Sequence, residues 1–190
     1  WHRRSVTVVL LLSWKSDLKY LIHPSARKKG VAHYYTLNMK DKKARETFEA
    51  LFCYLGEQLG DNKKSRACNW VLGNEVNCCE AWNYSGKMSL NDCVENYAKA
   101  FQLLNQGIRR TASTSRMFIS LDHSWSASNE GHSGKKYLDA FAAYMDETAP
   151  KMGWNVNYHP YSQPLTRTDF WNDSSNTSGS SKTQYISMNN

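Results

Sequence analysis

Hydrophobic and polar positions follow two alternating patterns along this chain of 190 residues. Short apolar runs, each too short for a helix, are separated by longer segments in which apolar residues recur every three or four positions. An uninterrupted apolar run of this length is typical of a β-strand that is covered on both faces. The sequence predicts four such strands, at Val6–Leu12, 69–75, 116–121 and Trp154–Tyr158.

The segments between these strands show the period of amphipathic α-helices. Asp41 is suited to cap the first helix, which we expect to end at Gly60. Ser89 begins the second helix, with Asp92 as an acidic capping-box partner, and the third helix covers roughly 135–149. The residues expected to face the core are Ala44, Phe48, Leu51, Phe52, Leu55, Leu59, Leu90, Val94, Ala98, Phe101, Leu104, Ile108, Tyr137, Leu138, Phe141, Tyr144 and Met145.

The alternation of strands and helices predicts an α/β fold with a parallel sheet. Two closures satisfy this order, an open doubly wound sheet or part of a (β/α)8 barrel. No glycine-rich phosphate loop follows any strand, which disfavours a nucleotide-binding sheet. Polar and aromatic clusters follow the strands and not the helices, as at the mouth of a TIM barrel. We therefore expect residues 1–190 to form a single, incomplete TIM-barrel domain, because a full barrel takes about 250 residues.

Charge and hydropathy argue against nucleic-acid binding and against a membrane span. The net charge of +7 comes from basic residues spread along the chain, without a stripe interleaved with stacking aromatics, so we expect no nucleic-acid partner. No apolar run reaches the roughly 18 residues that a membrane span requires. The start His2–Arg4, followed by an apolar run, imitates a signal peptide, but no small-residue cleavage site follows. A buried strand explains that run better.

The cysteines and histidines do not form a recognisable metal motif. Five cysteines, at positions 53, 68, 78, 79 and 93, are an odd number and argue against a full disulfide framework. One bridge from Cys93 to Cys78 or Cys79 stays open as an alternative. His123, His132 and His159 lack the paired spacing of metal ligands. We expect no metal and no cofactor.

Four strand ends carry the polar groups that suggest chemistry, namely Ser13–Trp14, Asn74–Glu75, Asp122–Trp125 and His159–Tyr161. If the strands are parallel, these ends meet at one edge of the sheet. The Glu75 carboxyl group, beside an amide, is then a candidate acid/base. The alternative is that Glu75 begins a loop and is solvated. For His123 and His159, the alternative is a structural role in which the ring hydrogen-bonds backbone carbonyls.

Several blocks in the sequence also resemble a known family. An Asn-Glu pair that closes a strand resembles the fourth-strand signature of the clan of retaining glycoside hydrolases with (β/α)8 barrels. A little-characterised bacterial family of glycosidase-like barrel domains is similar over a longer range. The blocks that carry this resemblance are Trp70–Asn77, Ala81–Gly86, Ile119–Trp125, Tyr158–Tyr161 and Phe170–Asp173, in that order, and Thr183–Asn190 fits as well.

The resemblance implies roles for individual residues and a class of substrate. Glu75 corresponds to the general acid/base, and Asn74 would hydrogen-bond the sugar hydroxyl next to the reacting carbon. His159 and Tyr161 would line the same cleft, and aromatic loops suit the faces of sugar rings. The expected partner is an oligosaccharide or polysaccharide. The substrate-binding residues expected are Asn74, Trp82, His123, Trp125, His159 and Tyr161.

The second catalytic carboxyl group that the resemblance requires is not found. Retaining glycosidases need a nucleophile in addition to the proton donor, and the clan places it on the seventh strand. Counted from the Asn-Glu pair, the four predicted strands are the third to the sixth. Asp122 and Asp173 do not match the nucleophile position. We therefore expect a catalytic-domain fragment without hydrolase activity of its own, and that expectation fails if the chain hydrolyses an aryl glycoside in a Glu75-dependent way.

Two other functions stay open beside this one. A barrel-like domain of this kind can bind a glycan without cleaving it. A doubly wound hydrolase or transferase acting through a histidine is disfavoured, because no Gly-x-Ser-x-Gly nucleophile elbow is present. The glycosidase resemblance favours a secreted or cell-surface location, which the sequence itself does not fix.

Overall fold

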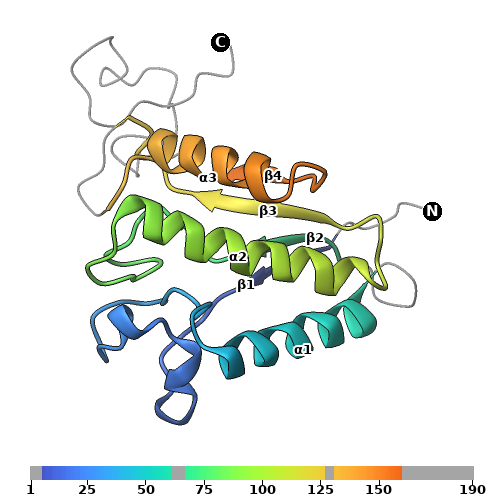
Figure 1. Ribbon diagram of the computed structural model, residues 1–190, viewed down its shortest axis with the longest axis horizontal. Coiled ribbons are helices and arrows are strands. Elements are labelled where there is room, and N and C mark those ends of the chain that lie inside the picture. Colours follow the sequence, from blue (N-terminus) through green and yellow to red (C-terminus); the bar gives the residue numbers. More distant parts are fainter. Residues whose placement is uncertain (1–5, 61–66, 127–130, 160–190) are drawn as a thin grey trace, which may run out of the picture.

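A computed structural model describes residues 6–60, 67–126 and 131–159. The chain alternates strands with helices (Figure 1). The strands are β1 (Val6–Leu10), β2 (Ala67–Leu72), β3 (Arg116–Leu121) and β4 (Asn155–Tyr158). The α-helices are α1 (Lys42–Leu59), α2 (Leu90–Arg109) and α3 (Gly134–Thr148), and two short 3-10 helices, η1 (Ser16–Leu21) and η2 (Pro24–Ala26), precede α1.

The four strands form one parallel sheet in the order β1-β2-β3-β4, so that each strand pairs with its neighbour in sequence. Helix α1 contacts α2, and α2 contacts α3. Figure 1 shows the three helices side by side in front of the strands. A doubly wound sheet carries helices on both faces. The predicted α/β class is confirmed, and in the described residues the strand order does not reverse and the helices lie on one face of the sheet.

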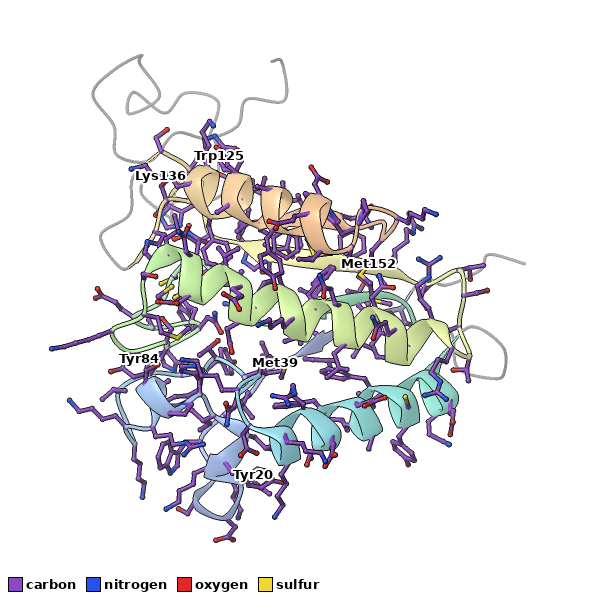
Figure 2. All side chains as sticks on the ribbon, viewed as in Figure 1. Tyr20, Met39, Tyr84, Trp125, Lys136 and Met152 are labelled. Atoms are coloured by element: carbon purple, nitrogen blue, oxygen red, sulfur yellow. The ribbon has the colours of Figure 1, made fainter. Side chains whose placement is uncertain are left out.

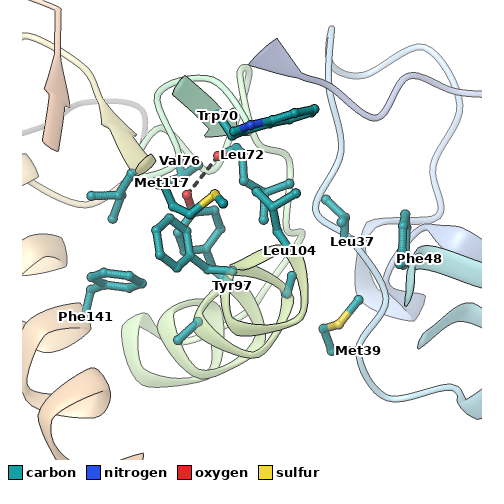
Figure 3. Packing of buried hydrophobic residues seen from close by; sticks show 14 of the residues in the cluster. Leu37, Met39, Phe48, Trp70, Leu72, Val76, Tyr97, Leu104, Met117 and Phe141 are labelled. Carbon is teal, nitrogen blue, oxygen red and sulfur yellow. Dashed lines mark hydrogen bonds between the residues drawn. The ribbon is translucent and has the colours of Figure 1, made fainter. Parts of the chain in front are cut away.

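The core lies between the sheet and the three helices. Alternate strand positions face the helices, because successive side chains in a strand point to opposite faces. Trp70, Leu72 and Met117 are such positions, and they pack against Tyr97 and Leu104 of α2 (Figure 3). The hydroxyl group of Tyr97 donates a hydrogen bond of 2.8 Å to the carbonyl of Leu72. This bond attaches α2 to the carboxyl end of β2.

Helices α1 and α2 approach closely through two glycines. A Cβ atom at Gly56 would lie 3.0 Å from the Cα of Ile108, and one at Gly107 would lie 2.8 Å from the Cβ of Phe52. The contact therefore follows the glycines, and it leaves Leu51 44% exposed. The prediction that Leu51 faces the core is wrong. It was based on the spacing of apolar residues, which does not count glycine as part of the buried helix face.

The predicted caps are confirmed, whereas the strand boundaries need correction. Asp41 accepts a hydrogen bond from the Ala44 N–H, and Ser89 caps α2. Strand β1 ends at Leu10 and not at position 12, since the carbonyl of Leu12 turns away and accepts from the Tyr35 N–H at 2.9 Å. Strand β2 begins at position 67 and ends at position 72. The Asn-Glu pair therefore lies in the turn after β2, not on the strand.

The face of the sheet opposite the helices carries a mixture of apolar and polar side chains. By strand alternation, Val9, Ser120 and Asn157 point to this face. Val9 is 48% exposed. Among the described helices, none is both long and apolar enough to cross a lipid bilayer. The predicted site residue Tyr161, together with Asp173 and the segment 183–190, lies outside the described residues.

Candidate functional site

Glu75 lies in the turn that follows β2, and its backbone conformation is unusual. Its φ is +44°, and no other non-glycine residue among those described has a positive φ. Such a backbone is costly for a residue with a Cβ and persists where the surrounding structure enforces it. Here the Glu75 N–H donates to Ser120 Oγ at 3.2 Å and the Val76 N–H donates to the Ser120 carbonyl at 2.8 Å. These two bonds tie the turn to β3.

His159 follows β4 and meets Glu75 across the end of β3. Its Nδ1 lies 2.9 Å from Glu75 Oε1, and its backbone N–H donates to the carbonyl of Leu121 at 3.0 Å. Asn157 Nδ2 lies 3.1 Å from His159 Nε2, and in the tautomer in which Nε2 accepts from this amide, Nδ1 donates its proton to Glu75 Oε1. Ser120 Oγ lies 3.4 Å from the same Nε2. Glu75, Ser120, Asn157 and His159 form what we call the Glu75 network.

The Glu75 network is largely buried but can be reached from solvent. The side chain of Glu75 is 8% exposed, and that of His159 is 22% exposed. The network lies at the carboxyl edge of the parallel strands, where α/β proteins place their ligand sites. A carboxyl group held in one orientation by a hydrogen bond can give a proton to a bound molecule or take one from it. The arrangement is therefore suited to acid/base chemistry.

Asp122, the carboxyl group that follows β3, lies in a different setting. Its Oδ1 accepts from Asn77 Nδ2 at 2.7 Å and from the Ser124 N–H at 3.0 Å, while its own N–H donates to Asn77 Oδ1 at 3.0 Å. Asn77 Nδ2 also donates to the carbonyl of His132 at 2.9 Å. We call this arrangement the Asn77–Asp122 latch. It joins the loops after β2 and β3 to the segment before α3, and its role is structural.

The other predicted site residues are distributed over different parts of this edge. Asn74 is half-buried next to Glu75. The carbonyl of His123 accepts a hydrogen bond of 3.1 Å from the hydroxyl of Tyr158. Trp125 packs edge-to-face on Tyr158, with ring centroids 5.8 Å apart, near Lys136 and the start of α3 (Figure 2). The structure brings His159 to Glu75, whereas Trp125 packs toward the helices.

Trp82 belongs to a separate aromatic cluster formed by two loops. Its ring stacks on the exposed ring of His33 with a centroid distance of 4.6 Å, and Tyr34 lies 6.2 Å away. The backbone joins the same loops, because the His33 N–H donates to the carbonyl of Ala81 at 3.2 Å. The loops that follow β1 and β2 thus share an aromatic surface at this end of the molecule.

Two members of the Glu75 network were missed by the reasoning from sequence. Ser120 is fully buried between two apolar residues of β3, and Asn157 lies on β4, two residues before His159. A signal was present for both. Each is a polar residue at an alternate strand position that faces away from the helices, where an apolar residue would otherwise be expected.

The five cysteines form no disulfide bond with one another in the part of the chain that the structure describes. Cys79 Sγ lies 3.9 Å from Cys93 Sγ, and His132 brings a ring nitrogen close to both sulfurs. A hydrogen bond from Cys79 lowers the pKa of the Cys93 thiol, and the same bond, with burial, raises the pKa of Cys79. Burial and the nearby Lys136 lower the pKa of His132. These three residues are not the three histidines that the sequence brought to attention.

The described residues thus define a parallel α/β domain with a polar site at the carboxyl edge of its sheet. The chain belongs to the protein family described as "Family of unknown function (DUF5722)", whose profile matches residues 2–190. A comparison with curated proteins found no match. The family description carries no activity, so a function has to be argued from the site.

Proposed function

We propose that this chain contributes the acid/base, Glu75, of a retaining glycoside hydrolase domain. The observation that carries the proposal is the 2.9 Å contact between Glu75 Oε1 and His159 Nδ1 at the carboxyl edge of parallel strands. Barrel enzymes place their catalytic groups at this edge. The resemblance of the motif blocks around Asn74–Glu75 and His159 supplies the substrate class, an oligosaccharide or polysaccharide.

We also propose that the sheet is part of a (β/α)8 barrel, from roughly the third to the sixth strand. Three features of the described residues support this. The strands follow one another in sequence order, the helices cover one face, and the opposite face carries polar side chains such as Ser120 and Asn157. The 48% exposure of Val9 on that face is expected for an inward position whose barrel neighbours lie outside the described residues.

In this proposal the chemistry proceeds in two steps. Glu75 protonates the glycosidic oxygen as its bond to the anomeric carbon breaks, and a second carboxylate attacks that carbon. Glu75 then takes a proton from the water that hydrolyses the glycosyl-enzyme. His159 positions the Glu75 carboxyl group through Nδ1, and Asn74 binds the neighbouring sugar hydroxyl. The resemblance assigns the second carboxylate to a later strand, and Asp122 is not proposed for this role because the latch holds it.

The proposal is tested with the natural full-length protein and a panel of aryl glycosides. We expect wild-type protein to hydrolyse at least one of them and Glu75→Gln to lose nearly all of that turnover. Glu80→Gln is the matched control, because Glu80 is exposed on the same loop. Full activity in folded Glu75→Gln protein would contradict the assignment.

A carbohydrate-binding domain without hydrolytic activity is the second candidate. The aromatic cluster of His33, Tyr34 and Trp82 favours it, because aromatic faces that are exposed or half-buried can stack on sugar rings. The two functions differ in one measurement. If wild-type protein binds an oligosaccharide in calorimetry but cleaves none, and Trp82→Ala abolishes that binding, the binding function is supported and the hydrolase is not.

A further inference from the structure

Three side chains from distant parts of the chain converge beside the start of α2. Cys79 comes from the loop after β2, Cys93 from the first turns of α2, and His132 from the residue before the Ser133 cap of α3. One ligand atom from each lies within 4.8 Å of the other two, and the two sulfurs are 3.9 Å apart. In a tetrahedral zinc site with Zn–S bonds of about 2.3 Å, two sulfurs lie about 3.8 Å apart.

The backbone fixes the position of His132 relative to Cys79. The His132 N–H donates to the carbonyl of Asn77 at 2.9 Å, and the His132 carbonyl accepts from Asn77 Nδ2 at 2.9 Å. The neighbouring Gly131 has a φ of +145°, and a Cβ there would lie 2.4 Å from the Asn77 oxygen and 2.6 Å from the Cys79 nitrogen. The segment therefore packs against the Cys79 loop through its backbone. The ring of His132 is not needed for this contact and can serve as a ligand.

An independent observation comes from Tyr137 of α3. Its side chain is fully buried, yet its hydroxyl group has no hydrogen-bond partner within the described residues. The ring centroid of Tyr137 lies 6.5 Å from that of His132, and Tyr137 is close enough to Cys79 and Cys93 to interact with both. A buried hydroxyl without a partner is costly. The Tyr137 hydroxyl beside two thiols is therefore evidence for a missing acceptor at this place.

We propose that Cys79, Cys93 and His132 bind a zinc ion as two thiolates and one imidazole. Binding releases the two thiol protons, and it turns each sulfur into a strong acceptor. The Tyr137 hydroxyl then donates a hydrogen bond to a thiolate or to a water in the fourth coordination position. This site is separate from the Glu75 network, and it does not depend on the function proposed for Glu75.

The surroundings suit a zinc ion with soft ligands. Ser85 Oγ lies 3.3 Å from Cys93 Sγ and can hydrogen-bond the thiolate once the metal is bound. Cys93 also lies near the N-terminus of α2, where the helix dipole favours a negative charge. Two thiolates with one imidazole select zinc over calcium or magnesium, which prefer oxygen ligands. Because the ligands come from the loop after β2 and from the starts of α2 and α3, the ion would link three connections at one end of the domain.

The test uses the full chain, purified under reducing conditions, freed of metal with a chelator and titrated with Co²⁺ alone. We expect one Co²⁺ per chain, with a thiolate-to-cobalt charge-transfer band that Zn²⁺ removes. Cys79→Ser, Cys93→Ser and His132→Ala should each weaken binding by more than about tenfold, and Tyr137→Phe by about tenfold. His132→Ala keeps the backbone bonds to Asn77, so circular dichroism should show it folded.

Cys78→Ser is the matched control, because it removes the thiol next to Cys79 and should leave the cobalt spectrum unchanged. Three results would overturn the proposal. The reduced, folded wild-type chain could show no charge-transfer band. Cys78→Ser could weaken binding as much as Cys79→Ser. Finally, Cys79 and Cys93 could be found joined by a disulfide whose reduction confers no metal binding.

Discussion

Two carboxyl groups follow neighbouring strands of this domain, and their surroundings differ. Asp122, after β3, accepts hydrogen bonds from an amide and from a backbone N–H, and both partners belong to loops that it holds together. Glu75, after β2, contacts an ionisable side chain and sits on a backbone with φ of +44°. The same residue class at the same sheet edge thus serves packing in one place and is suited to chemistry in the other.

The comparison teaches which features separate a structural acid from a candidate catalytic one. The hydrogen bonds of the Asn77–Asp122 latch hold loops together, so their removal should lower the free energy of unfolding. A strained backbone that directs a carboxyl group toward a histidine gives no evident benefit to stability, and such strain is a common sign of function. We therefore expect substitutions of Asp122 to lower stability and substitutions of Glu75 to lower activity.

The largest effect is expected on the reactivity of Glu75→Ala in the full-length protein. Without a proton donor, hydrolysis of glycosides with poor leaving groups should fall by about 10²–10⁴-fold. Dinitrophenyl glycosides should be affected much less, because their leaving group needs no proton. Steady-state kcat/KM across a leaving-group series measures this. An equal loss for all leaving groups would assign Glu75 to substrate binding or folding instead.

The next effect concerns the stability of the latch. Asp122→Ala leaves the buried Asn77 amide without its partner, and we expect it to lower the free energy of unfolding by roughly 3 kcal/mol. Urea denaturation of the chain measures this loss. Glu75→Gln, a substitution at the other carboxyl group, should change the unfolding free energy far less. If Glu75→Gln is as destabilising as Asp122→Ala, the distinction between a structural Asp122 and a functional Glu75 is wrong.

A smaller effect on stability should come from the positive φ of Glu75, independently of its side chain. Glycine adopts a positive φ without steric cost, so Glu75→Gly should be more stable than Glu75→Ala by about 1 kcal/mol. Both variants lack the carboxyl group, and both should be equally inactive. Denaturation midpoints of the two variants provide the measurement. If the alanine variant is the more stable one, the positive φ of Glu75 carries no strain.

The smallest effect concerns the pH dependence of stability that comes from a buried histidine, His23. Burial lowers the pKa of His23 below its ordinary value of 6.5, and Lys40 and Arg27 add to the shift. Between the lowered pKa of the folded state and about 6.5, the unfolded chain therefore binds more protons than the folded one. The free energy of unfolding should fall as the pH drops below about 6.5. His23→Gln should reduce this slope, whereas His33→Gln, in an exposed part of the same loop, should not. An unchanged slope in His23→Gln would contradict the assignment.

The parts of the fold that depend on local pattern could be predicted from the sequence. Asp41 and Ser89 cap their helices as expected, since a cap is decided within four residues. The parallel sheet follows from the alternation of short apolar runs and amphipathic segments. Leu51 was assigned wrongly, because the contact surface of α1 is decided by Gly56 and by the partner helix rather than by apolar spacing.

The candidate site was predictable only in part, for a similar reason. Glu75 and His159 stand out as polar residues after strands, so their proximity follows from a parallel sheet. Trp125 has the same sequence signature, yet it packs on Tyr158, because the direction of a loop side chain is fixed by tertiary contacts. The convergence of Cys79 with His132 could not be foreseen, since it depends on the latch between loops distant in sequence.

Chemical rescue of Glu75→Ala by azide tests the central claim most directly. In the full-length protein, azide can attack the glycosyl-enzyme without a general base, so we expect faster turnover of a dinitrophenyl glycoside. The product should be a glycosyl azide with the anomeric configuration of the substrate. Folded Glu75→Ala protein that gives no azide product would contradict the acid/base assignment, and an azide product of inverted configuration would make Glu75 the nucleophile.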